Sequence, residues 1–341
     1  MKTRYFKILS PDSEDIAKVA DILKNGGVAA IPTETVYGLA GNALKGQCVK
    51  KIYEAKGRPS DNPLIVHISD ISQWAPLVKH IPESAMALAE KFWPGPLTVI
   101  LPKSDIIPPE ISGGLDTVAV RMPSDEIARA IIDKCGFPLA APSANTSGKP
   151  SPTCAQHVYS DLDGKIEAIV DSGKCSVGIE STVITLATDI PRLLRPGGVT
   201  PEMLTEVLGE IEIDDAVYNK LQEGAVAASP GMKYKHYSPT AKVLIIKGSF
   251  ENYKKYIEDS AETGDIALCF EEEVKDLNIR CITYGRKDDP SSQAKHIFDA
   301  LRKVDEEKAK TVFARFPENE GIGLAVFNRL VRAAAFNIIE V

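Results

Sequence analysis

The spacing of apolar residues in the first part of the chain predicts a mixture of helices and strands. Ile16, Val19, Ala20 and Leu23 recur at helical intervals, so we expect an amphipathic helix over residues 14–26. Short apolar runs between turn-forming residues indicate strands. We expect further helices over residues 84–92 and 125–134, and strands over residues 28–32, 63–68, 97–101, 118–121, 138–142, 168–170 and 181–186. Because the order is irregular, these elements favour one twisted α/β sheet with both parallel and antiparallel pairs.

Beyond residue 241 the elements alternate regularly. We expect strands over residues 243–246, 266–270 and 311–314, and helices over residues 253–260, 293–304 and 324–336. This β-α-β-α order is typical of a small Rossmann-like domain. No GxGxxG motif follows its first strand, so we assign it no dinucleotide.

The segment between the two patterns has the composition of a linker, with Gly and Pro interrupting polar residues. The predicted organisation is therefore a first domain over residues 1–215, a linker or lid over residues 216–241 and a second domain over residues 242–341. A length of 341 residues agrees with two domains.

Charge and cysteine usage narrow the class of protein. The 47 acidic and 40 basic side chains give a net charge of -7, which disfavours broad binding to nucleic acid or to anionic membranes. The 6 cysteines form no CxxC pair, so a zinc knuckle or a dithiol redox motif is not expected. Isolated thiols, an N-terminus without the apolar core of a signal peptide and no apolar run of about 18 residues favour a cytoplasmic globular protein.

Polar loops follow several predicted strands. They lie at residues 33–35, 143–151, 171–173 and 195–198, and they are rich in Ser, Thr, Asn, Gly and Arg. Ligand sites in α/β sheets lie at strand ends, where such side chains bind phosphates and ribose. For one such loop taken alone, an ordinary turn is the favoured interpretation.

The segment over residues 56–67 combines two cations, a glycine, two prolines and an apolar run that ends in His67. We interpret it as a rigid basic corner suited to a polyphosphate, although Lys56 and Arg58 could also form a solvated surface pair. Arg121 lies within an apolar strand and therefore needs an anion, for which Asp116 or a substrate carboxylate are the candidates.

Conventional catalytic groups are scarce. The 5 histidines are scattered, without an HExxH motif or a Ser-His-Asp order, and Glu34 and Glu180 are the candidate bases. We expect neither a covalent nucleophile nor a preassembled metal site.

A series of motifs in this order resembles the YrdC family over residues 10–210. They lie at residues 32–39, 56–59, 62–64, 92–98, 121–123, 142–148, 176–183 and 194–197. Residues 229–237 and the α/β domain that follows resemble the long, two-domain form of the family. The resemblance implies a YrdC-like mixed sheet with a large concave cavity, followed by the small Rossmann-like domain.

The resemblance also implies an activity, the synthesis of L-threonylcarbamoyladenylate and pyrophosphate from L-threonine, bicarbonate or CO2, and ATP. This nucleotidyltransferase product serves the t6A modification at position 37 of tRNA and passes to a tRNA threonylcarbamoyl transferase. Mg²⁺ is expected mainly on the ATP phosphates. Binding of tRNA is expected to be weak or indirect, with no stable DNA or membrane partner.

Family roles carry over to matching positions. The residues implied to bind L-threonine are Thr35, His67, Arg121, Ala141 and Ser181. Those implied to bind ATP are Arg58, Asn62, Thr117, Ser143, Ser151, Arg195 and, in the linker, Tyr234. Lys56 and Arg58 are the implied catalytic cations, since this chemistry needs position and positive potential rather than a nucleophile.

Two other functions fit parts of the sequence. One is an RNA-binding or translation-associated module without adenylation activity, against which the negative net charge argues. The other is a carbamoyltransferase related to hydrogenase maturation proteins, but the chain lacks their length and their CxxC pairs.

Overall fold

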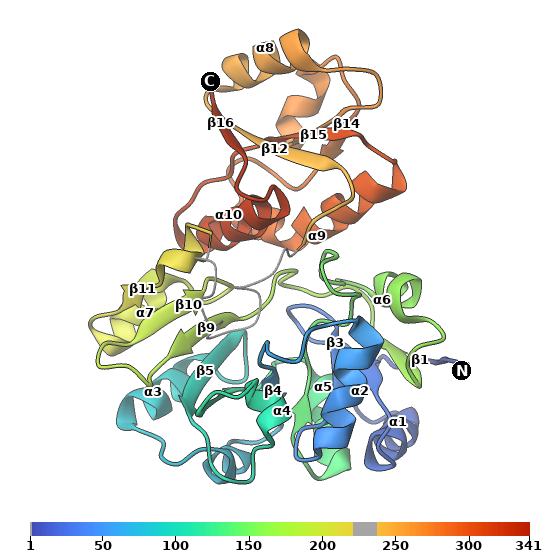
Figure 1. The fold of residues 1–341 in the computed structure, drawn as a ribbon, viewed down its shortest axis with the longest axis vertical. Coiled ribbons are helices and arrows are strands. Elements are labelled where there is room, and N and C mark those ends of the chain that lie inside the picture. Colours follow the sequence, from blue (N-terminus) through green and yellow to red (C-terminus); the bar gives the residue numbers. More distant parts are fainter. Residues whose placement is uncertain (1, 221–236) are drawn as a thin grey trace.

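Two β-sheets organise the chain. The computed structural model describes residues 2–220 and 237–341, which we call the first and the second domain, and Tyr234 lies outside these described residues. The first domain holds an 11-stranded sheet and the second a 5-stranded sheet. In the view of Figure 1 the second domain, in orange and red, lies above the first domain.

The large sheet has the order β1-β8-β2-β3-β7-β4-β6-β5-β9-β10-β11. Its strands are β1 (Arg4–Lys7), β2 (Ala29–Ile31), β3 (Gly38–Asn42), β4 (Ile65–His67), β5 (Leu97–Pro102), β6 (Thr117–Arg121), β7 (Leu139–Ala140), β8 (Ala168–Asp171), β9 (Thr182–Thr185), β10 (Arg192–Arg195) and β11 (Glu212–Ile213). Strand β4 pairs parallel with β6 and antiparallel with β7. The mixed sheet that the sequence predicts is therefore confirmed.

Helices cover the large sheet. They are α1 (Asp15–Lys24), α2 (Gly46–Lys56), α3 (Glu83–Phe92), α4 (Pro109–Ser112), α5 (Glu126–Cys135), α6 (Ala155–Leu162) and α7 (Pro201–Leu208). Short 3-10 helices lie at Ile71–Gln73, Ala75–Leu77 and Asp215–Val217. The predicted helix near the N-terminus is confirmed as α1, in which the four apolar residues of the predicted stripe, Ile16, Val19, Ala20 and Leu23, are buried.

The central strands have two different faces. Val66, Val99 and Val120 belong to the main hydrophobic core, together with residues of α3 and α7. Ile65 and Ala119 belong to a much smaller apolar cluster. Because successive side chains of a strand point to opposite faces, His67 lies on the same face as Ile65. This second face is thus available to polar side chains.

The sheet of the second domain is wholly parallel in its described residues, and its strand order is β14-β13-β15-β12-β16. The strands are β12 (Lys242–Lys247), β13 (Ile266–Cys269), β14 (Cys281–Thr283), β15 (Thr311–Arg315) and β16 (Ile338–Glu340). The helices are α8 (Phe250–Ser260), α9 (Pro290–Glu306) and α10 (Gly321–Ala333), with a 3-10 helix at Glu271–Asp276. The predicted Rossmann-like character is confirmed.

Helices α9 and α10 form the contact between the domains (Figure 1). Asn328 Nδ2 donates a hydrogen bond to the carbonyl of Val217 at 2.8 Å, and Arg332 donates to the carbonyl of Ala216 at 2.6 Å. Gly178 has a φ of +84°, and a Cβ atom there would lie 2.4 Å from Cα of Lys295 on α9. Only glycine allows the backbones to approach so closely. The close packing of α9 against the first domain therefore depends on the glycine at position 178.

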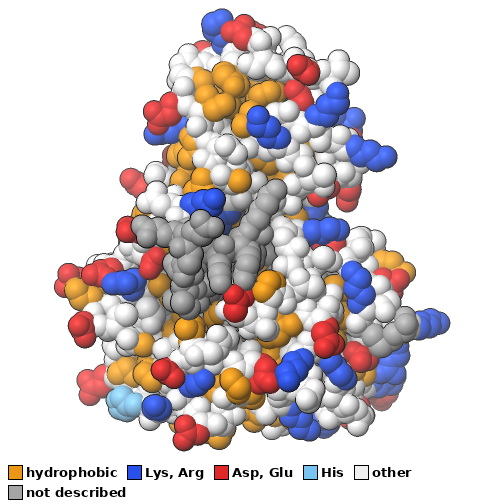
Figure 2. Space-filling model, viewed as in Figure 1, with side chains coloured by type: hydrophobic (Ala, Val, Ile, Leu, Met, Phe, Trp, Pro, Cys, Tyr) orange, Lys and Arg blue, Asp and Glu red, His pale blue; other side chains and the backbone are white. Residues whose placement is uncertain are grey.

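The surface carries charges of both signs. On the face shown in Figure 2, lysine and arginine side chains of the described residues are interspersed with acidic ones rather than gathered into one basic patch. In the part of the chain that the structure describes, no helix is long and apolar enough to cross a membrane.

Candidate functional site

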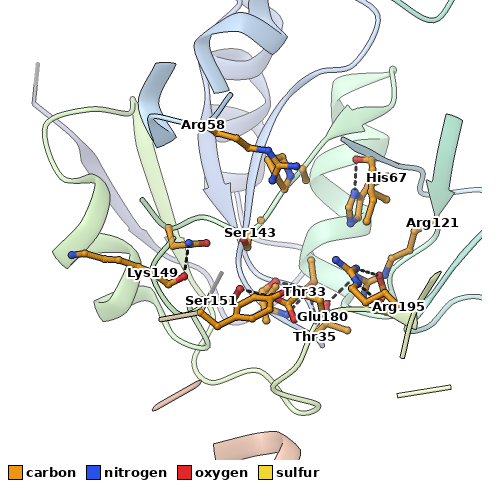
Figure 3. A pocket seen from close by; sticks show the side chains of 18 residues that line it. Thr33, Thr35, Arg58, His67, Arg121, Ser143, Lys149, Ser151, Glu180 and Arg195 are labelled. Atoms are coloured by element: carbon orange, nitrogen blue, oxygen red, sulfur yellow. Dashed lines mark hydrogen bonds between the residues drawn. The ribbon is translucent and has the colours of Figure 1, made fainter. Parts of the chain in front are cut away.

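A polar cavity lies against the second face of the central strands, and its empty volume, which includes space open to solvent, is about 620 Å³. In Figure 3, Arg58 lies above the cavity, Lys149 on the left, and Arg121 and Arg195 on the right. The other lining residues are Thr33, Thr35, Val36, Gly38, Ile65, His67, Ala141, Pro142, Ser143, Asn145, Ser151, Glu180, Ser181 and Tyr237. Four cations around a polar cavity suit an anionic ligand.

Strands β4 and β6 supply one wall. His67 and Arg121 are register partners on these parallel strands, and each is only 3% exposed. Strand β7, which leads to Ala141 and Ser143, runs antiparallel to β4. The contributing strands therefore do not end at one edge of the sheet, and the cavity lies across its face.

Arg121 is held by three neighbours. Its guanidinium lies 2.7 Å from Glu34, donates to Thr35 Oγ1 at 2.8 Å and donates to the carbonyl of Gly95 at 3.3 Å. The buried anion is thus Glu34, which corrects the expectation of Asp116. Asp116 is exposed at the surface, whereas Glu34 sits in the buried turn between β2 and β3.

That turn is rigid. Thr33 Oγ1 donates to the carbonyl of Val36 at 2.7 Å and lies 2.8 Å from Thr35 Oγ1. Its oxygen also accepts the backbone N–H of Val36 at 3.2 Å. A Thr side chain that bonds its own turn fixes the local backbone. The hydroxyl of Thr35 is thereby presented to Arg121 and to the cavity.

His67 is neutral in this environment. Burial and the nearby Arg121 charge lower the pKa of its imidazole to about 3. Its Nδ1 lies 3.2 Å from the carbonyl of Ile65. Because a carbonyl only accepts, Nδ1 must carry the hydrogen, and Nε2 is left as a hydrogen-bond acceptor.

Arg195, at the end of β10, fixes the start of β9. It donates from Nε to the carbonyl of Ser181 at 3.0 Å and from a terminal nitrogen to Ser181 Oγ at 3.1 Å. Burial lowers the pKa of the guanidinium to about 10. Arg195 is therefore still charged at neutral pH.

The predicted basic corner forms the end of helix α2. Gly57 follows the helix with a φ of +60°, a left-handed conformation that turns the chain sharply. Arg58 then donates to the carbonyls of Asn62 and Pro63 at 3.3 and 3.1 Å. These contacts hold its guanidinium over the cavity (Figure 3).

Lys56 lies beneath the cavity rather than in its lining. Its ammonium donates to the carbonyls of Ser143 and Asn145, the latter at 2.7 Å. The residue is 2% exposed, and burial followed by the charge of Arg58 holds its pKa well below the usual value. These contacts give Lys56 the role of positioning the loop over residues 143–151.

The same loop is held from its other side by Asp161 on α6. This carboxylate accepts from the backbone N–H of Thr146 at 3.3 Å and pairs with Lys149 at 3.3 Å. It also accepts from Arg302 on α9 at 3.0 Å, and Arg302 donates to the carbonyl of Pro150 at 2.6 Å. The second domain thus contributes directly to the loop that lines the cavity.

Glu180 is a second point at which the second domain contacts the cavity lining. One carboxylate oxygen accepts a short hydrogen bond from Ser151, and the other accepts from Arg329 Nε on α10 at 2.7 Å. Arg329 is fully buried. Burial alone would raise the pKa of Glu180, but the charges of Arg329 and Arg195 hold it below the usual value. Glu180 is therefore ionised, and Arg329 compensates its charge.

Most of the residues that the family resemblance implies come together in the cavity. Those in its lining are Thr35, Arg58, His67, Arg121, Ala141, Ser143, Ser151, Ser181 and Arg195. Lys56, Asn62 and Thr117 are described but lie outside the lining. Asn62 is fully buried, and its side-chain atoms have no hydrogen-bond partner among the described residues.

Other lining residues were not assigned from sequence. They are Thr33, Val36, Gly38, Ile65, Pro142, Asn145, Lys149 and Tyr237, whereas Glu180 was named from sequence only as a candidate base. The density of Ser, Asn and Lys in the loop over residues 143–151 was a usable signal for Asn145 and Lys149. Tyr237 had no such signal, because its position against Phe298, at 5.1 Å between ring centres, depends on the second domain.

The described residues hold no candidate metal cluster. In residues 2–220 and 237–341 no group of three or more His, Cys, Asp or Glu side chains could hold an ion. The carboxylates of Glu34 and Glu180 are each occupied by an arginine. The cavity is therefore built to bind anions through cations, hydroxyls and amides.

Comparison with known families identifies both parts of the chain. Residues 21–197 match the family model of Sua5, YciO and YrdC, described as telomere recombination. Residues 199–335 match the model described as the C-terminal domain of threonylcarbamoyl-AMP synthase.

The chain belongs to the two-domain Sua5/YrdC family.

Curated relatives of this family extend over almost the whole chain. The threonylcarbamoyl-AMP synthase of Bacillus subtilis is 48% identical, covering 97% of this chain and 96% of the relative. That of Pyrococcus abyssi is 47% identical, covering 94% of each. The resemblance drawn from sequence motifs is thus confirmed, and the family is one of enzymes.

Solved structures of the Sua5/YrdC family have the same fold. The crystal structure of P. abyssi Sua5 complexed with L-threonine is 44% identical, covers 100% of this chain and 99% of its own, and has a TM-score of 0.90. A P. abyssi Sua5 variant altered at two positions has a TM-score of 0.91 over 99% and 98% of the two chains. The likeness includes both domains.

Proposed function

We propose that this protein condenses L-threonine, bicarbonate or CO2, and ATP into L-threonylcarbamoyladenylate and pyrophosphate. The observation that carries the proposal is the cavity, in which a buried polar wall faces a second wall rich in cations and amides. The full-length similarity to relatives named threonylcarbamoyl-AMP synthase supports it. The proposed roles of the cavity residues divide between L-threonine and ATP.

L-Threonine occupies the side of the cavity near β4 and β6. Arg121, already oriented by Glu34 and Thr35, attracts the substrate carboxylate. Ser181, held by Arg195, and the backbone at Ala141 complete the contacts of the amino acid. Charge compensation by Glu34 keeps Arg121 fixed, so binding requires little rearrangement.

The neutral imidazole of His67 suits the amine of threonine. Its Nε2 is an acceptor, because Nδ1 donates to the carbonyl of Ile65. An acceptor at this point favours an amine hydrogen directed to it and leaves the nitrogen lone pair for CO2. The amine must be neutral to form the carbamate, and a second cation here would oppose the nearby Arg121.

ATP occupies the side formed by Arg58 and the loop over residues 143–151. Ser143, Ser151 and the cations Arg58 and Arg195 surround the phosphates, and Thr117, Asn62 and Tyr234 are further proposed contacts. Lys56 acts through the loop, since its ammonium is engaged by the carbonyls of Ser143 and Asn145. The ATP phosphates would hold most of the bonds to a Mg²⁺ ion, which would offset their negative charge.

The chemical step is an attack of a carbamate oxygen on the α-phosphorus of ATP, with pyrophosphate as the leaving group. Such a transfer needs alignment and positive potential more than covalent participation by the protein. The carbamate is unstable in water, so an enclosed site favours the reaction. The linker over residues 216–241, including Tyr234, is the proposed lid.

The product serves t6A formation at position 37 of tRNA by passing to a tRNA threonylcarbamoyl transferase. The proposal includes a cytoplasmic location, where ATP and tRNA are both present. The proposed organisation is a catalytic domain over residues 1–215, a linker or lid over residues 216–241 and a small domain over residues 242–341. The competing function, an RNA-binding module without adenylation activity, gains no support from the mixed charges visible in Figure 2.

Release of pyrophosphate from ATP tests the proposal. We expect release only when L-threonine and bicarbonate are both present. Arg58→Ala is expected to lower kcat/KM by well over tenfold, because a charge-assisted contact contributes about 1.5–3 kcal/mol. The control is Arg286→Ala, since Arg286 is exposed on the second domain and its side chain bonds to Glu272 across 3.5 Å, while its backbone carbonyl is unaffected by the substitution.

Two outcomes would contradict the assignment. One is pyrophosphate release that does not depend on threonine, and the other is equal kinetics for Arg58→Ala and Arg286→Ala. Tight, salt-sensitive binding of tRNA without ATP, in a protein that releases no pyrophosphate, would instead favour the RNA-binding function.

A further inference from the structure

The sheet face behind the cavity carries a polar row of side chains beside an apolar row. His67 on β4 and Arg121 on β6 are register partners and form the polar row. Two residues back along the same strands, Ile65 pairs with Ala119, which in turn pairs with Ile100 on β5. Residues two apart on a strand share a face, so the apolar row runs directly alongside the polar one.

The members of the apolar row differ in their access to the cavity. Ile65, Ala119 and Ile100 are all buried and belong to one small apolar cluster. Of these three residues, Ile65 is the one that lines the cavity. The apolar cluster of the sheet face therefore meets the cavity at Ile65.

The segment that follows β7 adds a second apolar side chain next to Ile65. The backbone N–H of Ala141 donates to the carbonyl of Ile65 at 3.1 Å, and Ala141 also lines the cavity. The same carbonyl lies 3.2 Å from Nδ1 of His67. Ile65 is thus fixed between two residues, Ala141 and His67, that both belong to the proposed L-threonine site.

An amino acid bound across this face meets both rows. In the proposed function, on which this inference rests, Arg121 attracts the carboxylate of L-threonine and His67 accepts from its amine. Both groups leave the same Cα atom as the side chain, which branches at Cβ into a methyl and a hydroxyl group. A methyl group against Ile65 is removed from water, whereas a hydroxyl group there would find no hydrogen-bond partner on the isoleucine.

We propose that Ile65, with Ala141 beside it, contacts the methyl group of L-threonine and thereby selects this substrate over L-serine. Serine carries the same carboxylate, amine and hydroxyl group and lacks only the methyl group. The polar row binds both amino acids alike, so the selection comes from the apolar contact. One carbon in an apolar pocket changes kcat/KM by about 10- to 200-fold.

Pyrophosphate release with L-threonine and with L-serine, each with ATP and bicarbonate, measures the selection. We expect the wild type to prefer L-threonine at least tenfold in kcat/KM. Ile65→Ala is expected to lower this preference at least fivefold, because the loss falls on threonine and leaves serine almost unchanged. Ile65→Val, which removes a single methyl group, is expected to keep most of the preference.

Ile100→Ala is the matched control. Ile100 belongs to the same apolar cluster and is 4% exposed, against 6% for Ile65, but it lies outside the cavity lining. Its truncation removes the same atoms from the same cluster, and we expect the preference for threonine to stay within twofold of the wild type. Equal preferences in Ile65→Ala and Ile100→Ala would overturn the proposal and leave the proposed function intact.

L-allo-Threonine tests the contact without any substitution. It exchanges the methyl and hydroxyl groups at Cβ, so it directs a hydroxyl group to Ile65 when its carboxylate and amine keep their places. We expect its kcat/KM in the wild type to be at least tenfold below that of L-threonine. Equal use of L-threonine and either analogue would overturn the proposal. Pyrophosphate release with none of the three amino acids would overturn the proposed function, and this contact with it.

Discussion

At the residue scale, the cavity depends on side chains whose charges are set by burial. Arg121 and Glu180 are ionised because each has a buried partner, Glu34 and Arg329 respectively. His67 has no buried acid at hydrogen-bonding distance in the described contacts and is neutral instead. The sequence indicated that Arg121 needs an anion, but Glu34, at a separation of 87 positions, could not be selected from the candidates by local pattern.

The neutral His67 predicts a loss of stability in acid. The unfolded chain takes up a proton below its ordinary pKa of about 6.5, whereas the folded protein does so only near pH 3. Between these values the unfolded state binds more protons, so the free energy of unfolding falls as the pH is lowered. The contribution of His67 approaches about 1.4 kcal/mol for each pH unit.

Urea unfolding at pH 7, 6, 5 and 4 measures this effect. We expect His67→Gln to show a weaker loss of stability in acid than the wild type. His80→Gln is the control, because His80 is exposed in the first domain. Parallel pH dependences of the wild type and His67→Gln would show that His67 is already protonated in the folded protein.

At the element scale, α10 of the second domain supports the side of the cavity that we propose to bind the nucleotide. Arg329 compensates Glu180, and Glu180 accepts from Ser151. We expect Arg329→Met to raise the KM for ATP at least tenfold, with a smaller change in threonine affinity. Removing one partner of a buried ion pair also lowers the free energy of unfolding by about 3–5 kcal/mol.

Arg332→Met is the matched control for this prediction. Arg332 is also buried on α10, and it donates to the carbonyl of Ala216 rather than to Glu180. We expect it to lower stability without a comparable rise in the KM for ATP, and Arg329→Lys to recover part of the loss. Equal rises in KM for the two methionine variants would assign Arg329 a purely structural role.

Several elements were predictable and others were not. The helix over residues 14–26 and strands β12, β13 and β15 of the second domain were recognised because their apolar residues repeat with one period, whereas the short strands β14 and β16 were not predicted. Strand β3, in contrast, contains Gly38 and Gly41 and has little strand propensity of its own. It exists because β2 and β7 pair with it on either side. Such pairing is a tertiary effect that a local pattern does not contain.

At the scale of the whole molecule, the second domain contacts the proposed nucleotide side of the cavity more than the proposed threonine side. Arg302 and Arg329 reach the loop over residues 143–151 and Glu180. His67, Arg121 and Thr35 are held by residues of the first domain. This asymmetry predicts different effects of the second domain on the two substrates.

Removal of residues 230–341 tests the asymmetry. The first domain has its own large core, so we expect it to remain folded by circular dichroism. Turnover should fall at least tenfold, and calorimetry should show weaker binding of ATP with threonine binding less affected. Full turnover by the shortened protein would show that neither the lid nor the two arginines contribute.

The sequence by itself determined the family, the fold class and most of the residue types in the cavity, because these depend on motifs and periodicities that are local in the chain. Only the tertiary structure decided how those residues are used. It placed Lys56 beneath the loop instead of in the lining, chose Glu34 as the partner of Arg121, and brought Arg329 to Glu180 from the other domain. Burial and long-range pairing decide such roles, since the energy of a charge depends on the groups that surround it in space.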